Sequence, residues 1–419
     1  MADIDVYLDS EGLRPKIGLL RAYPKRGRES VTFGYDAAWT SEQGCFPIEP
    51  SLPIGPGLFR PSRDRIMFGS LGDSAPDTWG RNLMRRQERR TAKRQGRAAR
   101  ALQESDFLLG VADCARLGAL RLKRAGESEF QAPLETGVPN TLALGTLLRI
   151  SERVQFDEET DDDLSLLLGP GSSLGGARPK ASVTNADGSL SLAKFPKVTD
   201  DYSVERWEAI AMDLAMRAGI RTASHRIIDI RGKLVLLSRR FDRHGDVRIP
   251  FLSAMTMTQR RDGEQGSYLE IVDALSGQGA NAKPDRAELF KRVALSILIS
   301  NTDDHLRNHG FLRLDARGWT LCPAYDINPT PGYVKPRILS TAIDLDDGTC
   351  SIDLLRSVAE EFSLGLASAD SIISGVAMVT RNWRAAAIRR DAPRGEIDRL
   401  AGAFEHSDLN DALTLSVRG

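Results

Sequence analysis

Residues that build disulfide frameworks and transition-metal sites are scarce in this chain of 419 residues, which has four cysteines and five histidines. The cysteines are scattered and form no C-x-x-C pair, so we expect reduced, structural thiols of the kind found in a cytoplasm. His305 and His309 are four residues apart, but the H-E-x-x-H pattern of zinc proteases does not surround them. The sequence therefore argues against a disulfide scaffold and against a zinc site.

The chain also has a formal net charge of zero and lacks long apolar runs. Lys plus Arg and Asp plus Glu each total 57, so the chain as a whole has no general attraction to nucleic acid or to a membrane. Its apolar runs are much shorter than the roughly 20 residues of a membrane helix, and its first residues show no secretion signal. With 41% hydrophobic and 27% charged residues, we expect a cytoplasmic globular protein of two or three domains.

The most informative segment that is present is NTDDHLRN, residues 301–308. Asp303 and Asn308 stand there as D-x-x-x-x-N, and a further acid, Asp326, follows. Transfer of a phosphoryl group from ATP requires a base beside the acceptor hydroxyl and oxygen ligands for Mg²⁺. A kinase catalytic loop supplies them with an Asp, an Asn after four intervening residues, and a later Asp. The order of these residue types therefore indicates a kinase site.

The flanking segments predict how this site is built. Residues 293–300 are apolar and predict a buried helix that ends where the polar cluster begins. Residues 311–315 and 319–326 predict a short hairpin that delivers Asp326. From these residues alone an alternative stays open, in which residues 301–304 cap a helix end and Asp326 begins a turn.

A glycine-rich segment that contains Ser172 and Ser173 lies upstream, at residues 169–183. Glycines allow backbone N–H groups to approach phosphate oxygens without obstruction by a Cβ atom. The segment is not a Walker A loop, because no Lys-Ser or Lys-Thr pair follows its glycines. It also departs from the G-x-G-x-x-G loop of protein kinases, since Leu174 stands where the last glycine belongs. A glycine-rich surface turn is the alternative interpretation.

A lysine on a strand follows the glycine-rich segment. Residues 189–196 alternate between apolar and polar types and predict a strand that places Lys194 among apolar neighbours. The apolar spacing of residues 204–220 predicts a helix that stops at Gly219. Glu208 on that helix is our candidate ion-pair partner for Lys194. Glu205 is an equal alternative, and either glutamate could be a solvated helix residue.

Together these motifs resemble the HipA-like serine/threonine kinases, the toxins of bacterial toxin-antitoxin pairs, over nearly the whole chain. The ordered segments that carry the resemblance are FGYDAAW (33–39), PSLPI (50–54), LGDSAPDTWGRNLM (71–84), SLGGARPK (173–180), AKFP (193–196), RRFDR (239–243), NTDDHLRNHGFL (301–312) and PAYDINP (323–329). The resemblance implies an α+β, protein-kinase-like bilobal fold with an additional strand-rich N-terminal subdomain and a helical C-terminal lobe. The expected segments are a HipA-like N-terminal subdomain at 1–150, a small lobe with the phosphate loop at 151–238, and a helical large lobe with the catalytic loop at 239–419.

The resemblance also implies roles for individual residues, with ATP and Mg²⁺ as cofactors. Asp303 would be the catalytic base, Asn308 and Asp326 would bind Mg²⁺, and Lys194 would contact the ATP phosphates. The other nucleotide-binding residues would be Gly175, Gly176, Ala177, Arg178, Pro179 and Lys180 in the phosphate loop, Arg239, Arg240 and Phe241 in a hinge beside adenine, and His305. Ser173 matches the serine that such kinases autophosphorylate, with Ser172 as the neighbouring alternative. Two departures are Arg239, where the family often has Glu, and the Arg178-Pro179 pair, which replaces more polar residues.

Charge is unevenly distributed along the chain. The run from Arg81 to Arg100 is rich in Arg and Lys and contains a single acid, Glu88. It predicts a helix that begins at Thr78 and loosens near Gly96. Acidic residues are concentrated in a different segment, residues 156–165. A second basic cluster spans residues 381–390. The basic run could be a solvated helix face, or it could contact the phosphates of nucleic acid. Neither cluster has interleaved aromatic residues apart from Trp383, so stacking on single strands is not indicated.

The partners that the resemblance implies are a HipB-like helix-turn-helix antitoxin, operator DNA bound through the antitoxin complex, and a protein substrate of translation. An aminoacyl-tRNA synthetase with its tRNA is the substrate that we expect, and no membrane is expected as a partner. Two functions of other classes stay open: a DNA-bound transcriptional corepressor with a vestigial kinase site, and a small-molecule kinase. The oligomeric state, the antitoxin and the substrate protein cannot be identified from the sequence.

Overall fold

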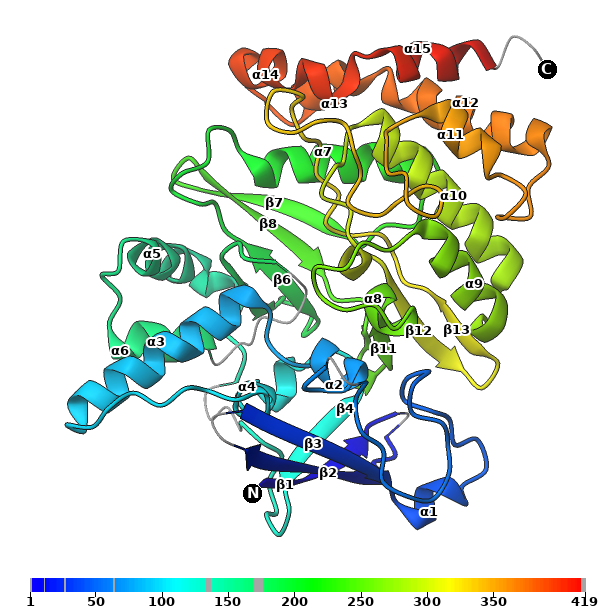
Figure 1. Ribbon diagram of the computed structural model, residues 1–419. Helices are drawn as coiled ribbons and strands as arrows, with labels where there is room; N and C mark the ends of the chain where they lie inside the picture. Colours follow the sequence, from blue (N-terminus) through cyan, green and yellow to red (C-terminus); the bar gives the residue numbers. More distant parts are fainter. Residues whose placement is uncertain are drawn as a thin grey trace. The chain divides into compact units, whose positions relative to one another are not determined.

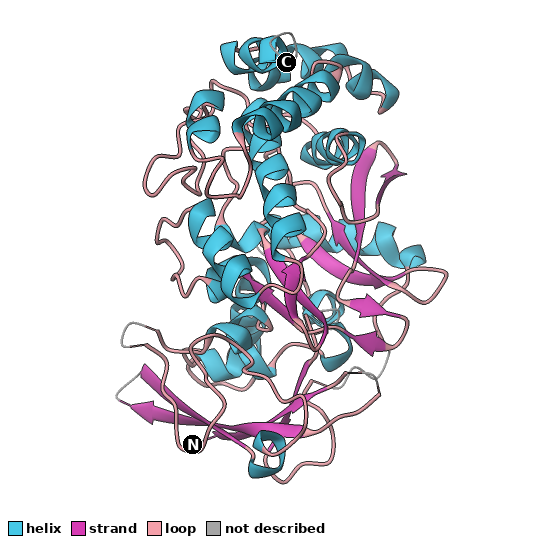
Figure 2. Ribbon diagram, turned by 90° about the vertical axis from the view of Figure 1, so that its right-hand side faces the viewer, coloured by secondary structure: helices cyan, strands magenta, loops and turns pink. Residues whose placement is uncertain are grey.

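The computed structural model describes residues 2–10, 12–25, 28–62, 65–132, 137–168 and 176–415. Its contacts divide the chain into two compact units. Unit 1 contains Met1–Thr199 and Ile230–Leu252, and unit 2 contains Asp200–Asp229 and Ser253–Gly419. Helices and antiparallel sheets are both prominent (Figures 1 and 2), so the chain has the expected α+β class. The three domain segments expected from the sequence stay a prediction, and these two units divide the chain differently.

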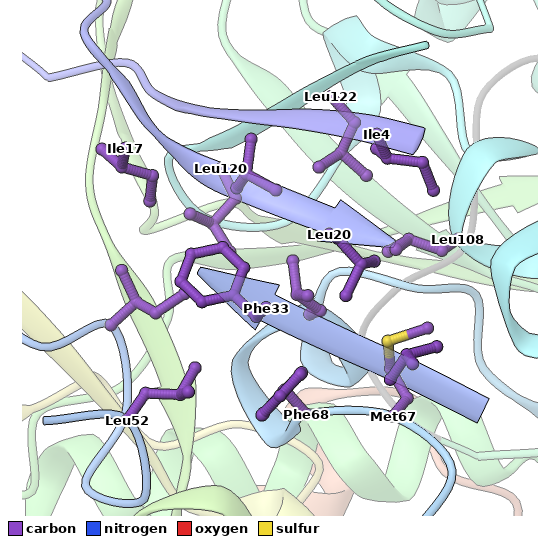
Figure 3. Packing of buried hydrophobic residues seen from close by; sticks show 14 of the residues in the cluster. Ile4, Ile17, Leu20, Phe33, Leu52, Met67, Phe68, Leu108, Leu120 and Leu122 are labelled. Carbon is purple, nitrogen blue, oxygen red and sulfur yellow. The ribbon is translucent and has the colours of Figure 1, made fainter. Parts of the chain in front are cut away.

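The N-terminal part of unit 1 is a four-stranded antiparallel sheet in the order β3-β2-β1-β4. Its strands are β1 (Ala2–Leu8), β2 (Lys16–Lys25), β3 (Arg28–Tyr35) and β4 (Leu120–Arg124). Alternate residues of β1, Ile4 and Val6, are buried, because successive side chains of a strand point to opposite faces. They pack in a cluster with Leu20, Phe33 and Leu122 (Figure 3), which forms the core of this subdomain.

The described residues of unit 1 also form helices before and after these strands. They are α1 (Ala37–Thr40), α2 (Gly69–Asp73), α3 (Thr78–Arg94), α4 (Glu104–Leu109), α5 (Leu144–Gln155) and α6 (Asp161–Leu168), with short 3₁₀ turns η1 (Asp113–Ala115) and η2 (Thr141–Ala143). Helix α3 begins at Thr78 because the Asp77 side chain accepts a hydrogen bond from the N–H of Gly80. Gly96 has a φ of +64°, which ends the helical path. The helix predicted for the basic run is therefore confirmed.

A second sheet of unit 1 carries the predicted lysine. Strands β5 (Lys180–Thr184), β6 (Leu190–Lys194) and β8 (Lys233–Arg239) are neighbours in that order, and both pairings are antiparallel. The strand predicted over residues 189–196 is confirmed as β6, which is shorter and ends at Lys194. The strand β7 (His225–Ile230) precedes β8, and the short strands β9 (Arg243–His244), β10 (Val247–Arg248) and β11 (Phe251–Ser253) follow it.

Unit 2 is mainly helical. It contains α7 (Val204–Arg217), α8 (Ala254–Met257), α9 (Tyr268–Gln278), α10 (Ala282–Leu298), α11 (Ile352–Ser357), α12 (Leu366–Thr380), α13 (Trp383–Arg389), α14 (Arg394–Phe404) and α15 (Ser407–Thr414), with the 3₁₀ turn η3 (Leu306–Asn308). The predicted hairpin is confirmed as the antiparallel strands β12 (Gly310–Asp315) and β13 (Gly318–Leu321). The buried helix predicted before the polar cluster is the end of α10.

Two boundaries between helices of unit 2 follow from particular residues. The loop between α9 and α10 is confined to residues 279–281, because α10 already begins at Ala282. Pro284 lies in the first turn of α10, where a missing backbone N–H costs no helical hydrogen bond. Helix α12 ends at Thr380, and Trp383 begins α13. The ring of Trp383 stacks on Phe404 at 4.6 Å, so tertiary packing decides this break. In the part of the chain that the structure describes, no helix is long and apolar enough to cross a membrane.

Candidate active site

Asp303 and Asp304, neighbours in the loop between α10 and β12, have opposite surroundings. Asp304 is buried, and its carboxylate accepts hydrogen bonds from the Tyr268 hydroxyl at 2.5 Å and the Ser296 hydroxyl at 3.0 Å. His309 Nε2 lies 3.0 Å from its other oxygen. Burial opposes the charge of Asp304, but His309 and these donors outweigh it and lower its pKa. Asp304 therefore anchors the loop to α9 and α10.

The side chain of Asp303 remains 66% exposed, and its contact is the Nζ atom of Lys335 at 3.6 Å. An ion pair of this exposure and distance contributes little energy, so a ligand can displace it at small cost. The rigid neighbour thus presents Asp303 to solvent as a carboxylate that can receive a proton.

Asn308 provides a buried amide oxygen. Its Nδ2 donates to the backbone oxygen of Asp303 at 3.2 Å, which fixes the amide. Its Oδ1 is buried and has no hydrogen-bond partner among the residues that the structure describes. A buried acceptor without a partner is costly, and a bound cation or an ordered water would satisfy it.

Asp326 lies in a segment that is attached to the same loop at both ends. The Tyr325 hydroxyl donates to the Arg307 oxygen at 2.6 Å, and the Asn328 N–H donates to Asn301 Oδ1 at 3.1 Å. Asp326 itself has a φ of +57°, which is uncommon outside glycine, Asn and Asp. A small cavity of about 20 Å³ is lined jointly by loop residues and by segment residues, among them Asn308, Tyr325 and Ile327. These contacts bring Asp326 to the loop of Asp303 and Asn308.

The donor set fits Mg²⁺. Mg²⁺ usually keeps waters and binds one or two protein oxygens together with substrate phosphates. Asp326 supplies a carboxylate, and Asn308 supplies the amide oxygen that lacks a partner. Among the described residues, no group of three His, Cys, Asp or Glu side chains could hold a metal alone. A divalent cation at this position would therefore share its coordination with a ligand.

Lys180 and Lys194 of unit 1 are directly opposite each other on β5 and β6. Both side chains are buried, and like charges opposite each other on neighbouring strands are destabilising. Asp77, at the start of α3, relieves this repulsion with an ion pair to Lys180 Nζ at 2.8 Å. The Lys180 ammonium is thus held by the fold, and its nucleotide contact stays a prediction.

The start of α3 also supports the end of the glycine-rich segment. Trp79 Nε1 donates to the Lys180 oxygen at 3.1 Å, and the Trp79 N–H donates to the Gly176 oxygen at 3.4 Å. Gly176 has a φ of +93°, a conformation that side chains disfavour. Gly176, Ala177 and Arg178 form a bend, and Pro179 connects it to β5. Gly175, Ser172 and Ser173 lie outside the described residues, so the expected loop and phosphorylation site stay predictions.

The hinge residues expected beside adenine differ in accessibility. Arg239 ends β8 with an exposed side chain 3.3 Å from Asp187, and the Phe241 ring lies 6.3 Å from that of Phe251. Arg240 is buried, and its guanidinium donates to Asp242 at 2.6 and 2.7 Å and to the Ala115 oxygen at 2.9 Å. The side chain of Arg240 is committed to the fold, and its backbone N–H donates to the Leu190 oxygen at 2.9 Å. The adenine contact expected of Arg240 stays a prediction.

Three side chains of the site carry no signal in the sequence. Asp304, Tyr268 and His309 are ordinary residues in their local patterns, and only the Asp-Asp doublet hints that one carboxylate is structural. His305, which we expected near nucleotide, is partly buried in the same loop, and its role stays a prediction. Glu208 and Glu205 are buried on α7 of unit 2, and the expected pairing of either with Lys194 also stays a prediction.

Comparison with known proteins finds relatives in sequence and in fold. A putative kinase, Y4dM of Sinorhizobium fredii (strain NBRC 101917 / NGR234), is 34% identical over 103 residues, which is 24% of this chain and only 25% of that protein. HipA of Shewanella oneidensis MR-1, solved with HipB and its operator DNA, matches the fold with a TM-score of 0.66 at 16% identity over 99% of this chain and 97% of that one. The Helicobacter pylori proinflammatory kinase CtkA gives a TM-score of 0.44 at 15% identity, over 58% of this chain and 93% of that one.

The fold likeness to HipA extends over almost all of both chains, although it is a likeness of fold alone at this identity. In sequence, residues 172–383 match the family described as the HipA-like C-terminal domain. This match includes β5, β6 and the loop of Asp303, Asn308 and Asp326, and it covers just over half of the chain. The chain therefore belongs to the family of proteins with a HipA-like C-terminal domain.

Proposed function

We propose that the chain is an ATP- and Mg²⁺-dependent serine/threonine protein kinase of the HipA type. The observation that carries the proposal is the loop at residues 301–308, where a buried anchor, Asp304, presents an exposed Asp303 next to an amide oxygen of Asn308 without a partner. Membership of the HipA-like family supports the same reaction. The joint presence of Lys194, Asp303, Asn308 and Asp326 argues against a vestigial site.

In the proposed reaction Asp303 would accept the proton of the serine or threonine hydroxyl as the hydroxyl oxygen attacks the γ-phosphorus of ATP. The bond between the γ-phosphorus and the β–γ bridging oxygen would break, so that ADP leaves. Asn308 and Asp326 would hold Mg²⁺, which would neutralise charge on the phosphates. Lys194 binds phosphate oxygens through its ammonium group. Asp304, Tyr268 and His309 keep the loop in place, so that Asp303 meets the hydroxyl without reorganisation.

Ser173 would be the site of autophosphorylation in this proposal, with Ser172 as the alternative. A phosphate group adds about two negative charges, and within a phosphate-binding loop it would repel ATP. The kinase would therefore limit its own activity.

The proposed setting is a toxin-antitoxin pair. The Shewanella HipA was solved with HipB and operator DNA, which supports a HipB-like antitoxin and operator DNA as partners. A protein of translation, such as an aminoacyl-tRNA synthetase, is the proposed substrate in trans.

Radiolabelled ATP tests the proposal directly. We expect the purified chain to incorporate label at Ser173 or Ser172, and Asp303→Ala and Asp326→Ala to reduce incorporation by about 10²–10⁴-fold, since a positioned base or charge contributes this much. Asp346→Ala removes an exposed carboxylate of unit 2 and serves as the control that keeps full labelling.

Three outcomes would contradict the proposal. No incorporation by the wild type would favour a DNA-bound corepressor. Label that appears only on added sugars or lipids would favour a small-molecule kinase. Labelling that persists in Asp303→Ala would contradict the role of Asp303 as the catalytic base.

A further inference from the structure

The cations of the basic run divide into two groups in the structure. Most of them are paired with acids, many of which come from the acidic stretch at residues 156–165, because α3 and α6 lie side by side (Figure 1). The pairs are Arg81 with Glu104 (2.7 Å), Arg86 with Asp157 (2.5 Å) and Glu159 (3.2 Å), Arg90 and Arg94 with Asp161 (2.6 and 2.7 Å), Arg97 with Glu88 (2.6 Å), and Arg100 with Asp106 (3.0 Å). The paired cations are therefore neutralised within unit 1.

Arg85, Arg89 and Lys93 remain, and we call them the α3 stripe. All three are exposed, and no acidic side chain among the described residues pairs with any of them. They recur every fourth residue, so they lie along one face of the helix. Arg85 is partly fixed, since its Nη1 donates to Asn82 Oδ1 at 3.0 Å and its guanidinium lies 5.0 Å from the centre of the Phe107 ring. The α3 stripe therefore contains the cations of the basic run that no acidic side chain of the described residues neutralises, and these cations lie in a row along the helix.

We propose that the α3 stripe binds the sugar-phosphate backbone of double-stranded DNA, without reading its sequence. The rise of an α-helix places Arg85 and Lys93 about 12 Å apart along the axis. One strand of B-DNA presents a phosphate about every 3.4 Å along its axis, so the stripe spans three to four phosphates. Because no acid competes for these cations, phosphate contacts would break no ion pair. This inference does not depend on kinase activity.

Other polyanions fit the stripe less well. A membrane surface would require apolar side chains beside the cations, whereas Leu83 and Trp79 of α3 are buried in the fold. Single-stranded nucleic acid would require exposed aromatic rings for base stacking, and the aromatic residue of α3, Trp79, is buried. The major groove of A-form RNA is deep and narrow, whereas that of B-DNA is about 12 Å wide and admits a helix. Duplex DNA is therefore the partner that this surface favours.

The test is a titration of fluorescent 30-base-pair DNA with the full-length chain at several salt concentrations. We expect the variant Arg85→Glu/Arg89→Glu/Lys93→Glu to bind about tenfold or more weakly than the wild type at low salt. The slope of log K against log salt should become shallower by about 3, because each lost phosphate contact contributes about 0.9. The control Arg60→Glu/Arg217→Glu/Lys283→Glu makes the same change of net charge at exposed cations elsewhere and should keep the wild-type slope.

Circular dichroism and thermal melts should show that both variants fold, since all six positions are exposed. The neutral variant Arg85→Gln/Arg89→Gln/Lys93→Gln supports the proposal if it shows the same loss of slope. Absence of DNA binding by the wild type at low salt would overturn the proposal, and so would equal slopes in the stripe and control variants. Binding of duplex RNA, an acidic protein or anionic vesicles through the stripe, with DNA binding unchanged, would overturn it in favour of that partner.

Discussion

Asp303 and Asp304 are adjacent in the sequence, but their side chains have different environments. Asp304 is surrounded by a tyrosine hydroxyl, a serine hydroxyl and a histidine ring, whereas Asp303 has a single distant lysine contact. The same residue type therefore serves stability at one position and is available for chemistry at the next. Substitution can separate these two roles.

We expect Asp304→Asn to lower the free energy of unfolding by about 3 kcal/mol, because it leaves buried donors and His309 without their charged partner. Asp303→Asn should change it by no more than about 0.5 kcal/mol, as is usual at exposed positions. Urea denaturation of the two variants measures both values. Equal destabilisation by the two changes would show that the anchor has been assigned to the wrong carboxylate.

At the scale of elements, the junction between α10 and α15 contains a histidine that should make the fold sensitive to acid. His406 precedes α15, and its Nε2 lies 3.2 Å from the Leu298 oxygen at the end of α10. Burial and the charge of Arg337 lower the pKa of His406 to about 4. The unfolded chain, with an ordinary histidine pKa of about 6.5, therefore binds the proton more readily than the folded chain.

Stability should consequently fall as the pH drops below about 6.5, and the loss should level off near pH 4. At pH 5 we expect His406 to lower the free energy of unfolding by about 2 kcal/mol, because its pKa is about 4 in the folded chain and about 6.5 in the unfolded chain. His406→Gln keeps polar atoms there and cannot take up the proton, so its unfolding free energy should depend less steeply on pH between 7 and 5. Parallel curves for the variant and the wild type, measured by denaturation across this range, would refute the assignment.

Local sequence patterns predicted helices and strands well in this chain, but they did not predict which distant side chains contact one another. Apolar spacing and alternation predicted α7, the end of α10 and the β12–β13 hairpin, because these depend on residues close in sequence. The pairing of Arg90 with Asp161 joins residues 71 positions apart, and no local pattern encodes it. The loop of Asp303 and Asn308 was found from residue types and spacing, whereas its anchor Tyr268 lies 36 positions before Asp304 and could not be identified.

For the whole molecule, nucleotide binding should be visible as a gain in global stability. A ligand that binds only the folded state stabilises it by about 2.7 kcal/mol at one hundred times its dissociation constant. We therefore expect ATP with Mg²⁺ to raise the melting temperature of the wild type. Asp303→Ala should keep this increase, since a base is not needed for binding, and Asp326→Ala should lose most of it.

The comparison is informative even when no phosphate is transferred. The same melts with ATP and EDTA provide the control for the metal, and they should show a smaller increase. A full increase in Asp326→Ala would contradict its role as a Mg²⁺ ligand, while loss of the increase in Asp303→Ala would suggest that this carboxylate binds rather than reacts.

The burial of Arg240 limits how an inhibitor could address this protein. Its guanidinium is enclosed by Asp242 and by carbonyl groups of residues 115 and 116. An acidic compound designed to capture it would first have to separate a charge pair inside the protein, at a cost of several kcal/mol. Compounds directed at this segment should instead contact the exposed side chain of Arg239.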